Sequence, residues 1–214
     1  MLLKLIDSLL CPVSHEETWL VASVDEWRGP HVVRGVLGCP ICRAEYPIEK
    51  GVIDFARAGS ATAGTTPEGE GRTDHADVLR LAAQLDLREP GGIVLLAGRY
   101  AALARWLESI TAAQYVVVAS PGEAIPTGAE TGVVVAARLP LAARTVRAAA
   151  IDAAASREPL SADVARVLRG EGRLVAPADA PRPPAIRELA RDEREWVGVA
   201  SGEAAAAPVP LRRR

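Results

Sequence analysis

The amino-acid sequence predicts an α/β protein in two parts: a small cysteine-containing α+β domain, followed by a doubly wound, mostly parallel sheet. Two observations lead to this prediction. All three cysteines of the 214-residue chain lie before residue 56, in a stretch with only two alanines, Ala22 and Ala44. Beyond residue 74, short apolar runs alternate with segments of helical periodicity, which is typical of a parallel sheet covered by helices.

The composition is that of an ordinary globular protein, with 49% hydrophobic and 24% charged residues. The formal net charge of -2 gives no argument for a nucleic-acid partner, and no apolar stretch is long enough to predict a membrane span. The N-terminus lacks the pattern of a signal peptide. Three cysteines are too few for a disulfide scaffold, so we expect a reducing, cytoplasmic setting.

The change in composition falls on residues 57–73, a run of Gly, Ser, Thr and Ala without periodicity, which is typical of a linker. It predicts a boundary between a domain over 1–56 and a domain over 74–200. The tail over 201–214 is expected to be frayed.

The first elements are predicted from apolar spacing. Leucine and isoleucine recur at helical spacing over residues 2–10 and predict a short amphipathic helix that stops at Cys11-Pro12. Strands are predicted over 19–24 and 32–37, with Gly29-Pro30 as the turn between them.

The cysteines suggest a metal site. Cys39 and Cys42 form a C-x-x-C pair, which can place two thiolates on one tetrahedral zinc, and Cys11 follows the first helix. The position for a fourth cysteine is Ser14, but the adjacent His15 can supply an imidazole nitrogen. The predicted ligands are therefore Cys11, His15, Cys39 and Cys42. The alternative is that the metal has been lost and the cysteines are small buried hydrophobic residues.

This part of the chain resembles the Trm112-like family of small zinc-ribbon proteins over residues 1–56. The resemblance implies a zinc ribbon that acts as a partner subunit, binding methyltransferases and covering apolar surface on them. Ser14 departs from the family pattern at the second cysteine. The matching residues are Leu10, Cys11, Pro12, Cys39, Cys42, Tyr46, Pro47, Ile48, Gly51 and Ile53.

The second domain is predicted from buried-strand runs separated by helices. Its ligand crevice is expected where the strands end at their carboxyl termini. Helices are predicted over 74–85, 100–110 and 161–168, the last capped by Ser161 and ended by Gly170, and strands over 93–97, 115–119, 132–136, 146–151, 173–176 and 195–200.

This order resembles the Rossmann-like fold of class I S-adenosylmethionine-dependent methyltransferases over residues 75–200. The passage over 137–152 is similar to the family's entry into its fourth strand, and the passage over 165–175 to its entry into the fifth. The resemblance implies a cofactor site at the carboxyl ends of the strands.

The cofactor motifs depart from that family. Its acidic residue and glycine-rich turn after the first strand are replaced by Ala97 and a single glycine, Gly98, followed by Arg99 and Tyr100. The second strand offers Ser120 where an acid is expected, and the third offers only Ala136 or Ala137. Each lost hydrogen bond to a charged or buried group costs about 1.5–3 kcal/mol, so S-adenosylmethionine is not expected to bind in the ordinary way.

The residues left to contact a cofactor are Ala97, Gly98, Ser120 and Asp152. Asp152 follows the fourth strand of the second domain and is the best isolated acid, although a cap on the next segment is an alternative role.

Two hypotheses follow for the function. The first is a non-catalytic binding or scaffold protein, whose ribbon covers either its own sheet or a separate partner. That partner is a protein, a methyltransferase or a second copy of the chain. The alternative is a divergent methyltransferase that carries its own activator domain and holds the cofactor through backbone atoms and Ser120.

Overall fold

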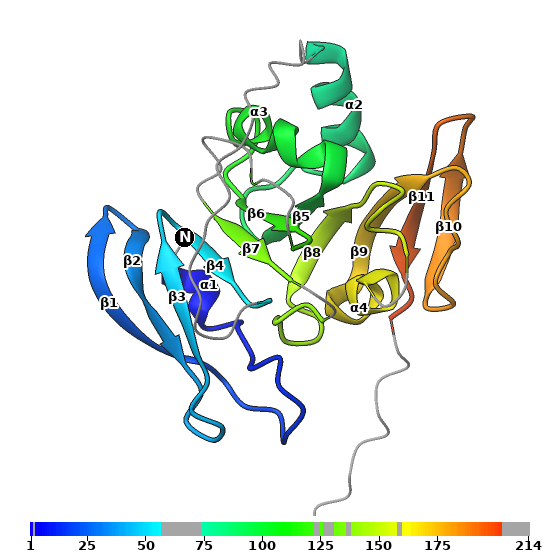
Figure 1. Ribbon diagram of the computed structural model, residues 1–214. Helices are drawn as coiled ribbons and strands as arrows, with labels where there is room; N and C mark the ends of the chain where they lie inside the picture. The colour runs from blue at the N-terminus through cyan, green and yellow to red at the C-terminus, as the bar shows by residue number, and fades with distance from the viewer. Residues whose placement is uncertain are drawn as a thin grey trace, which may run out of the picture.

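The computed structural model of the chain describes residues 1, 3–56, 74–121, 125, 131–135, 138–157 and 160–202. One mixed sheet of eleven strands runs through this part of the chain, and helices lie on both of its faces (Figure 1). The predicted linker over 57–73, the crevice positions Ala136 and Ala137, and nearly all of the predicted tail lie outside the described residues.

Residues 1–56, which we call the ribbon, form an antiparallel meander at one end of the sheet. The predicted helix over 2–10 is wrong at its end, because the helix stops at Ile6. Leu9 and Leu10 instead form bridges with Leu141 and Trp19, and the pairing buries Leu9 completely. The elements of the ribbon are α1 (Leu3–Ile6), β1 (Val21–Arg28), β2 (His31–Gly38), β3 (Glu45–Glu49) and β4 (Val52–Asp54).

The predicted Rossmann-like, mostly parallel sheet is confirmed. Five strands run parallel in the spatial order β7-β6-β5-β8-β9, and successive strands are added on both sides of β5. Strand β11 is antiparallel to β9, and β10 forms the far edge. The strands are β5 (Ile93–Ala97), β6 (Gln114–Ala119), β7 (Gly132–Val134), β8 (Val146–Ala150), β9 (Leu168–Pro177), β10 (Ile186–Arg191) and β11 (Glu195–Ala200).

The passage from the last helix into β9 differs from the prediction. Helix α4 (Leu160–Val167) ends one residue before β9 begins, so Gly170 lies in a strand and does not end the helix. Ser161 is buried within α4 and does not precede it as a cap. The pairing of β8 with β9 shifts between Leu168 and Arg173, so the intervening residues form a bulge that the periodicity did not indicate.

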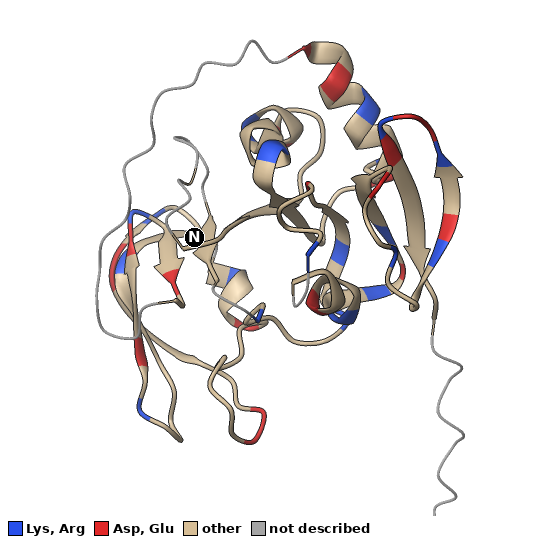
Figure 2. Ribbon diagram, turned by 45° about the vertical axis from the view of Figure 1, so that its right-hand side comes forward, with Lys and Arg blue, Asp and Glu red and all other residues tan. Residues whose placement is uncertain are grey.

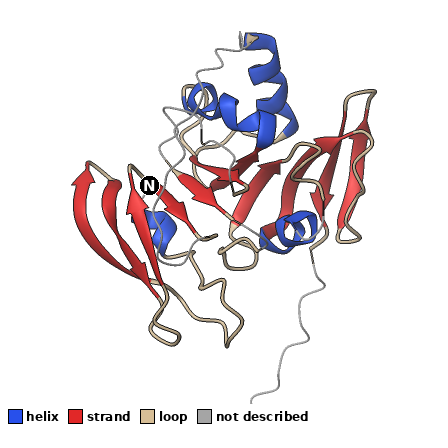
Figure 3. Cartoon of the chain, in the orientation of Figure 1, coloured by secondary structure: helices blue, strands red, loops and turns tan. Residues whose placement is uncertain are grey.

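Helices cover the sheet on two sides (Figure 3). On one side, α2 (His75–Gln84), the 3-10 helix η1 (Gly98–Leu103) and α3 (Ala104–Glu108) share a core with alternate residues of the parallel strands. The single helix predicted over 100–110 is therefore divided into η1 and α3. On the other side, α4 and the ribbon share the second core. No helix in the described ranges is long and apolar enough to cross a lipid bilayer.

The ribbon and the parallel strands meet at a continuous seam. Strand β4 pairs in parallel with β7, through Val52 with Gly132 and Ile53 with Val133. Beside it, the amide of Leu10 donates to the carbonyl of Pro140. The two predicted domains thus share one sheet in the described structure, and the core on the α4 side contains residues of both.

Charged side chains are distributed unevenly over this sheet (Figure 2). The parallel strands β5, β6 and β7 carry none, as expected for strands buried on both faces. Strand β10 at the far edge carries Arg187, Glu188 and Arg191, and charged side chains on an edge strand discourage pairing with another chain.

Candidate functional site

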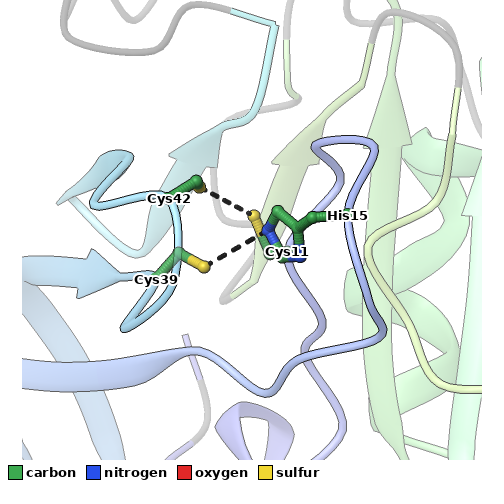
Figure 4. A group of neighbouring side chains, drawn as sticks. All are labelled: Cys11, His15, Cys39 and Cys42. Atoms are coloured by element: carbon green, nitrogen blue, oxygen red, sulfur yellow. Dashed lines mark hydrogen bonds between the residues drawn. The ribbon is translucent and has the colours of Figure 1, made fainter.

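The four predicted metal ligands lie together in space. Cys11 and His15 come from the segment between α1 and β1, and Cys39 and Cys42 from the turn between β2 and β3 (Figure 4). Their ligand atoms all lie within 4.8 Å of one another. The Sγ atoms of Cys11 and Cys42 are 3.7 Å apart, and the Sγ of Cys39 is 3.4 Å from the Nε2 of His15.

The two shortest of these distances match the edges of a tetrahedral zinc site. Zinc–sulfur and zinc–nitrogen bonds of about 2.3 Å and 2.0–2.1 Å give tetrahedral edges of about 3.8 Å between two sulfurs and about 3.6 Å between sulfur and nitrogen. The Nδ1 of His15 lies 2.6 Å from the carbonyl oxygen of Glu16. A carbonyl can only accept, so Nδ1 carries the proton and Nε2 keeps the lone pair that a metal requires.

The local backbone prepares one sulfur as a thiolate. Burial by itself raises the pKa of Cys39, but the backbone N–H groups of Cys42 and Ile41 donate to its sulfur and lower the pKa to about 6. Arg43 adopts a left-handed conformation with φ 61°, and its amide donates to the carbonyl of Cys39 at 3.0 Å. This turn closes the backbone around the sulfur.

The other cysteine knuckle has a different environment. Burial raises the pKa of Cys11 to about 11, and the hydroxyl of the buried Tyr46 lies 3.6 Å from its sulfur. A bound cation would remove the thiol proton outright, and the Tyr46 hydroxyl is placed to donate to the resulting thiolate. Ser14, at the position of the missing cysteine, is exposed and is not among the four clustered side chains.

The structure also brings together Gly98 and Asp152, two of the predicted cofactor residues. Ala97 ends β5 and is buried, and Gly98 follows it with φ 60°. A Cβ placed on Gly98 would overlap the Oδ2 of Asp152, so the carboxylate lies directly against the glycine. Ser120 is half-buried just after β6.

Asp152 has local partners. Its Oδ1 accepts from the amides of Ala154 and Ala155 at 3.1 and 3.0 Å, and its Oδ2 lies 3.3 Å from the amide of Arg99. The side chain therefore caps the next segment, which is the alternative role that the sequence left open, and it also holds the turn after β5.

A buried carboxylate that the sequence did not single out organises the same end of the sheet. Glu195 accepts from the Tyr100 hydroxyl and from Arg99, both at 2.6 Å, and from Gln84 at 3.0 Å. Burial raises the pKa of Glu195, but these donors and the charge of Arg80 outweigh it and bring the pKa below its usual value. Arg99 and Tyr100 are thus held against β11. No spacing in the sequence links Glu195 to residues almost a hundred positions earlier.

Substituting Gly98 by alanine is expected to destabilise the fold by at least about 1–3 kcal/mol, because the left-handed backbone is strained for alanine and the new methyl group would overlap the Asp152 carboxylate. Chemical denaturation would measure the loss. Gly29→Ala is the matched control, since Gly29 has φ 58° but a Cβ added there would meet nothing within 4 Å. Equal losses in the two variants would show that the Asp152 contact is unimportant.

No protein-family model and no curated protein matches the chain. Among solved structures, an RNA methyltransferase from Salinibacter ruber in complex with S-adenosyl-L-homocysteine has 13% identity and a TM-score of 0.44, covering 65% of this chain and 99% of its own. An S-adenosyl-L-methionine methyl transferase from Silicibacter pomeroyi has 14% identity and a TM-score of 0.42, covering 60% and 99%. Both of these structures are thus described as methyltransferases.

Proposed function

We propose that the chain is a non-catalytic protein-binding subunit, in which a zinc ribbon is joined to a methyltransferase-like sheet that does not use the cofactor. The contact between Gly98 and Asp152 carries the proposal. In the methyltransferase resemblance, the turn after β5 and the acid after β8 both face the cofactor site. Here the carboxylate lies against the turn, and its oxygens accept from three backbone amides of the same protein.

The turn itself supports the same proposal. A cofactor-binding turn needs small residues so that backbone amides can approach a ligand closely. In this chain the turn continues directly into η1, and Arg99 and Tyr100 are bound to the buried Glu195. Opening the turn for a ligand would break charge-assisted hydrogen bonds in a buried place, at a cost of about 1.5–3 kcal/mol each.

The ribbon would act as a partner subunit within the same chain. The Trm112-like resemblance implies a ribbon that covers apolar surface on a methyltransferase, and β4 pairs with β7 of the chain's own sheet. Zinc would be held by Cys11, His15, Cys39 and Cys42 and would supply structural cross-linking between the two knuckles. Reduced thiols are needed for this role, which fits the expected cytoplasmic setting.

A separate protein partner would meet the outer side of the ribbon. Of the ten large hydrophobic side chains that are exposed in the described residues, six belong to the ribbon, and the most exposed is Trp27 on β1 at 70%. Exposed apolar side chains gathered in one small unit are typical of protein-binding surfaces.

Isothermal titration of the zinc-loaded full chain with S-adenosylmethionine tests the proposal. We expect no heat of binding up to millimolar cofactor. A dissociation constant in the micromolar range would overturn it in favour of the divergent methyltransferase. If the cofactor binds, an Asp152→Asn variant would report whether the carboxylate is a ligand. Binding to the unsubstituted chain but not to a folded Asp152→Asn variant would identify Asp152 as a cofactor ligand.

A further inference from the structure

We infer that metal binding in the ribbon controls the order of residues 138–145, the connection that leads from β7 to β8. This β7–β8 connection has no helix or strand of its own in the described structure, apart from one bridge at Leu141. It is nevertheless well buried at Leu139, Leu141 and Ala142. Its order therefore depends on what it contacts. The inference rests on the zinc site of the proposed function and adds a consequence for the sheet.

One contact comes from the metal knuckle. The amide of Leu10, the residue next to Cys11, donates to the carbonyl of Pro140 at 3.0 Å. The amide of Ala142 donates to the carbonyl of Ser8 at 2.9 Å, and Leu9 and Leu141 form an antiparallel bridge between these bonds. The chain entering the metal site is thus paired with the β7–β8 connection immediately before the first ligand.

The same short segment is tied to the rest of the ribbon. The amide of Cys11 donates to the carbonyl of Thr18 at 2.9 Å, and the amide of Leu20 donates to the carbonyl of Leu9 at 3.1 Å. Apart from the bridge of Trp19 with Leu10, residues 11–20 have no helix or strand. A metal that joins Cys11 and His15 to Cys39 and Cys42 would therefore restrain this loop against the turn between β2 and β3.

Helix α4 holds the connection from the opposite side. Asp163 accepts from the amide of Leu139, and Arg166 donates to the carbonyls of Leu139 and Leu141 at 2.9 and 2.8 Å. Arg166 also pairs with Asp163 at 2.5 Å, and both side chains are mostly buried. The β7–β8 connection thus has two sets of contacts. Those with residues 8–10 lie next to the metal site and would be stabilised by metal, whereas those with α4 do not involve the metal site.

Loss of the contacts with residues 8–10, or of those with α4, should loosen the connection locally. Segments with few regular hydrogen bonds open in small cooperative units, so the knuckle and the connection should open together while distant strands stay closed. Because the coupling is reciprocal, disordering the connection by weakening the α4 contacts should in turn weaken metal binding. Zinc would thereby control how firmly residues 138–145 are held beside the sheet.

Hydrogen exchange on the full chain, measured by mass spectrometry with one equivalent of zinc and after chelation, tests this inference. We expect chelation to speed exchange about tenfold or more in peptides covering 8–12 and 138–145 together, with no change over β10 and β11. Faster exchange at 8–12 without any change at 138–145 would overturn the inference and leave the zinc site intact. If zinc analysis shows no uptake by the chain, the proposed metal centre fails first and this inference falls with it.

A substitution of Arg166, which holds the connection from α4, gives a second test. Arg166→Ala should speed exchange at 138–145 and weaken zinc affinity several-fold in a chelator competition, although Arg166 is not a ligand. Arg187→Ala, on the edge strand β10, is the matched control and should change neither quantity. Arg166→Lys keeps the charge but cannot bind both carbonyls and Asp163 in the same way, so an intermediate effect is expected. Unchanged zinc affinity in a folded Arg166→Ala variant would contradict the coupling.

Discussion

Cys39→Ser is expected to abolish zinc binding and to loosen the two metal knuckles before the rest of the sheet unfolds. Cys39 is buried, and its sulfur lies 3.4 Å from the Nε2 of His15, within the four-residue site. Apparent binding free energies of structural zinc are about 10–16 kcal/mol, comparable with the whole stability of a domain. Elemental analysis should therefore show the zinc content falling from about one ion per chain to nearly none, and thermal unfolding should begin at a much lower temperature.

Three controls make this result specific. Ser14→Ala alters an exposed side chain of the same loop and should leave the zinc content unchanged. His15→Cys keeps four ligands and should retain zinc, whereas His15→Ala should lose it. If the unsubstituted chain, purified in zinc-containing medium, carries the same negligible metal as Cys39→Ser, the metal proposal is wrong. The alternative role of small buried hydrophobic residues is in any case limited to Cys39, because Cys11 is half-buried and Cys42 is exposed.

Ile53→Asp should cost about 3–5 kcal/mol or more and detach the ribbon from the parallel strands. Ile53 is fully buried on β4 and pairs with Val133 of β7, so the substitution places an unpaired carboxylate in the shared core. Urea denaturation should show either a large loss of free energy or a split into two transitions, since the ribbon and the parallel strands would no longer unfold as one unit.

Val21→Asp is the matched control for this prediction. Val21 belongs to the same ribbon, but its side chain is 63% exposed on β1, so the new charge stays in water and the loss should be below about 0.5 kcal/mol. Similar losses for the two substitutions would mean that the β4–β7 seam adds little to stability.

The sequence predicts local features of this protein better than distant ones. The buried strands β5, β6 and β8 are short runs of apolar residues, which periodicity detects directly. The four predicted ligands do lie together. The C-x-x-C spacing accounts for Cys39 and Cys42, whereas the pairing within the ribbon brings Cys11 and His15 to them. Strand β10 was missed because most of its side chains are exposed and several are charged.

The pairings between distant segments could not be predicted in this way. The composition over 57–73 predicts a domain boundary but carries no information on how the two parts pack, so it could not reveal that Val52 and Gly132 are neighbours across one sheet. The partnership of Arg99 with Glu195 likewise joins residues that no local pattern relates. Such contacts depend on the topology of the whole sheet, and a single sequence contains no periodic signal for them.

The parallel pairing of β4 with β7 has a consequence for the order of events during synthesis. The ribosome completes the ribbon first, but the strand that covers its edge is made only after β5 and β6. Until then β4 presents unpaired amides and carbonyls, a template on which nascent chains can associate. Late, non-local pairings of this kind also slow folding. The ribbon made alone should therefore aggregate more readily than the complete chain.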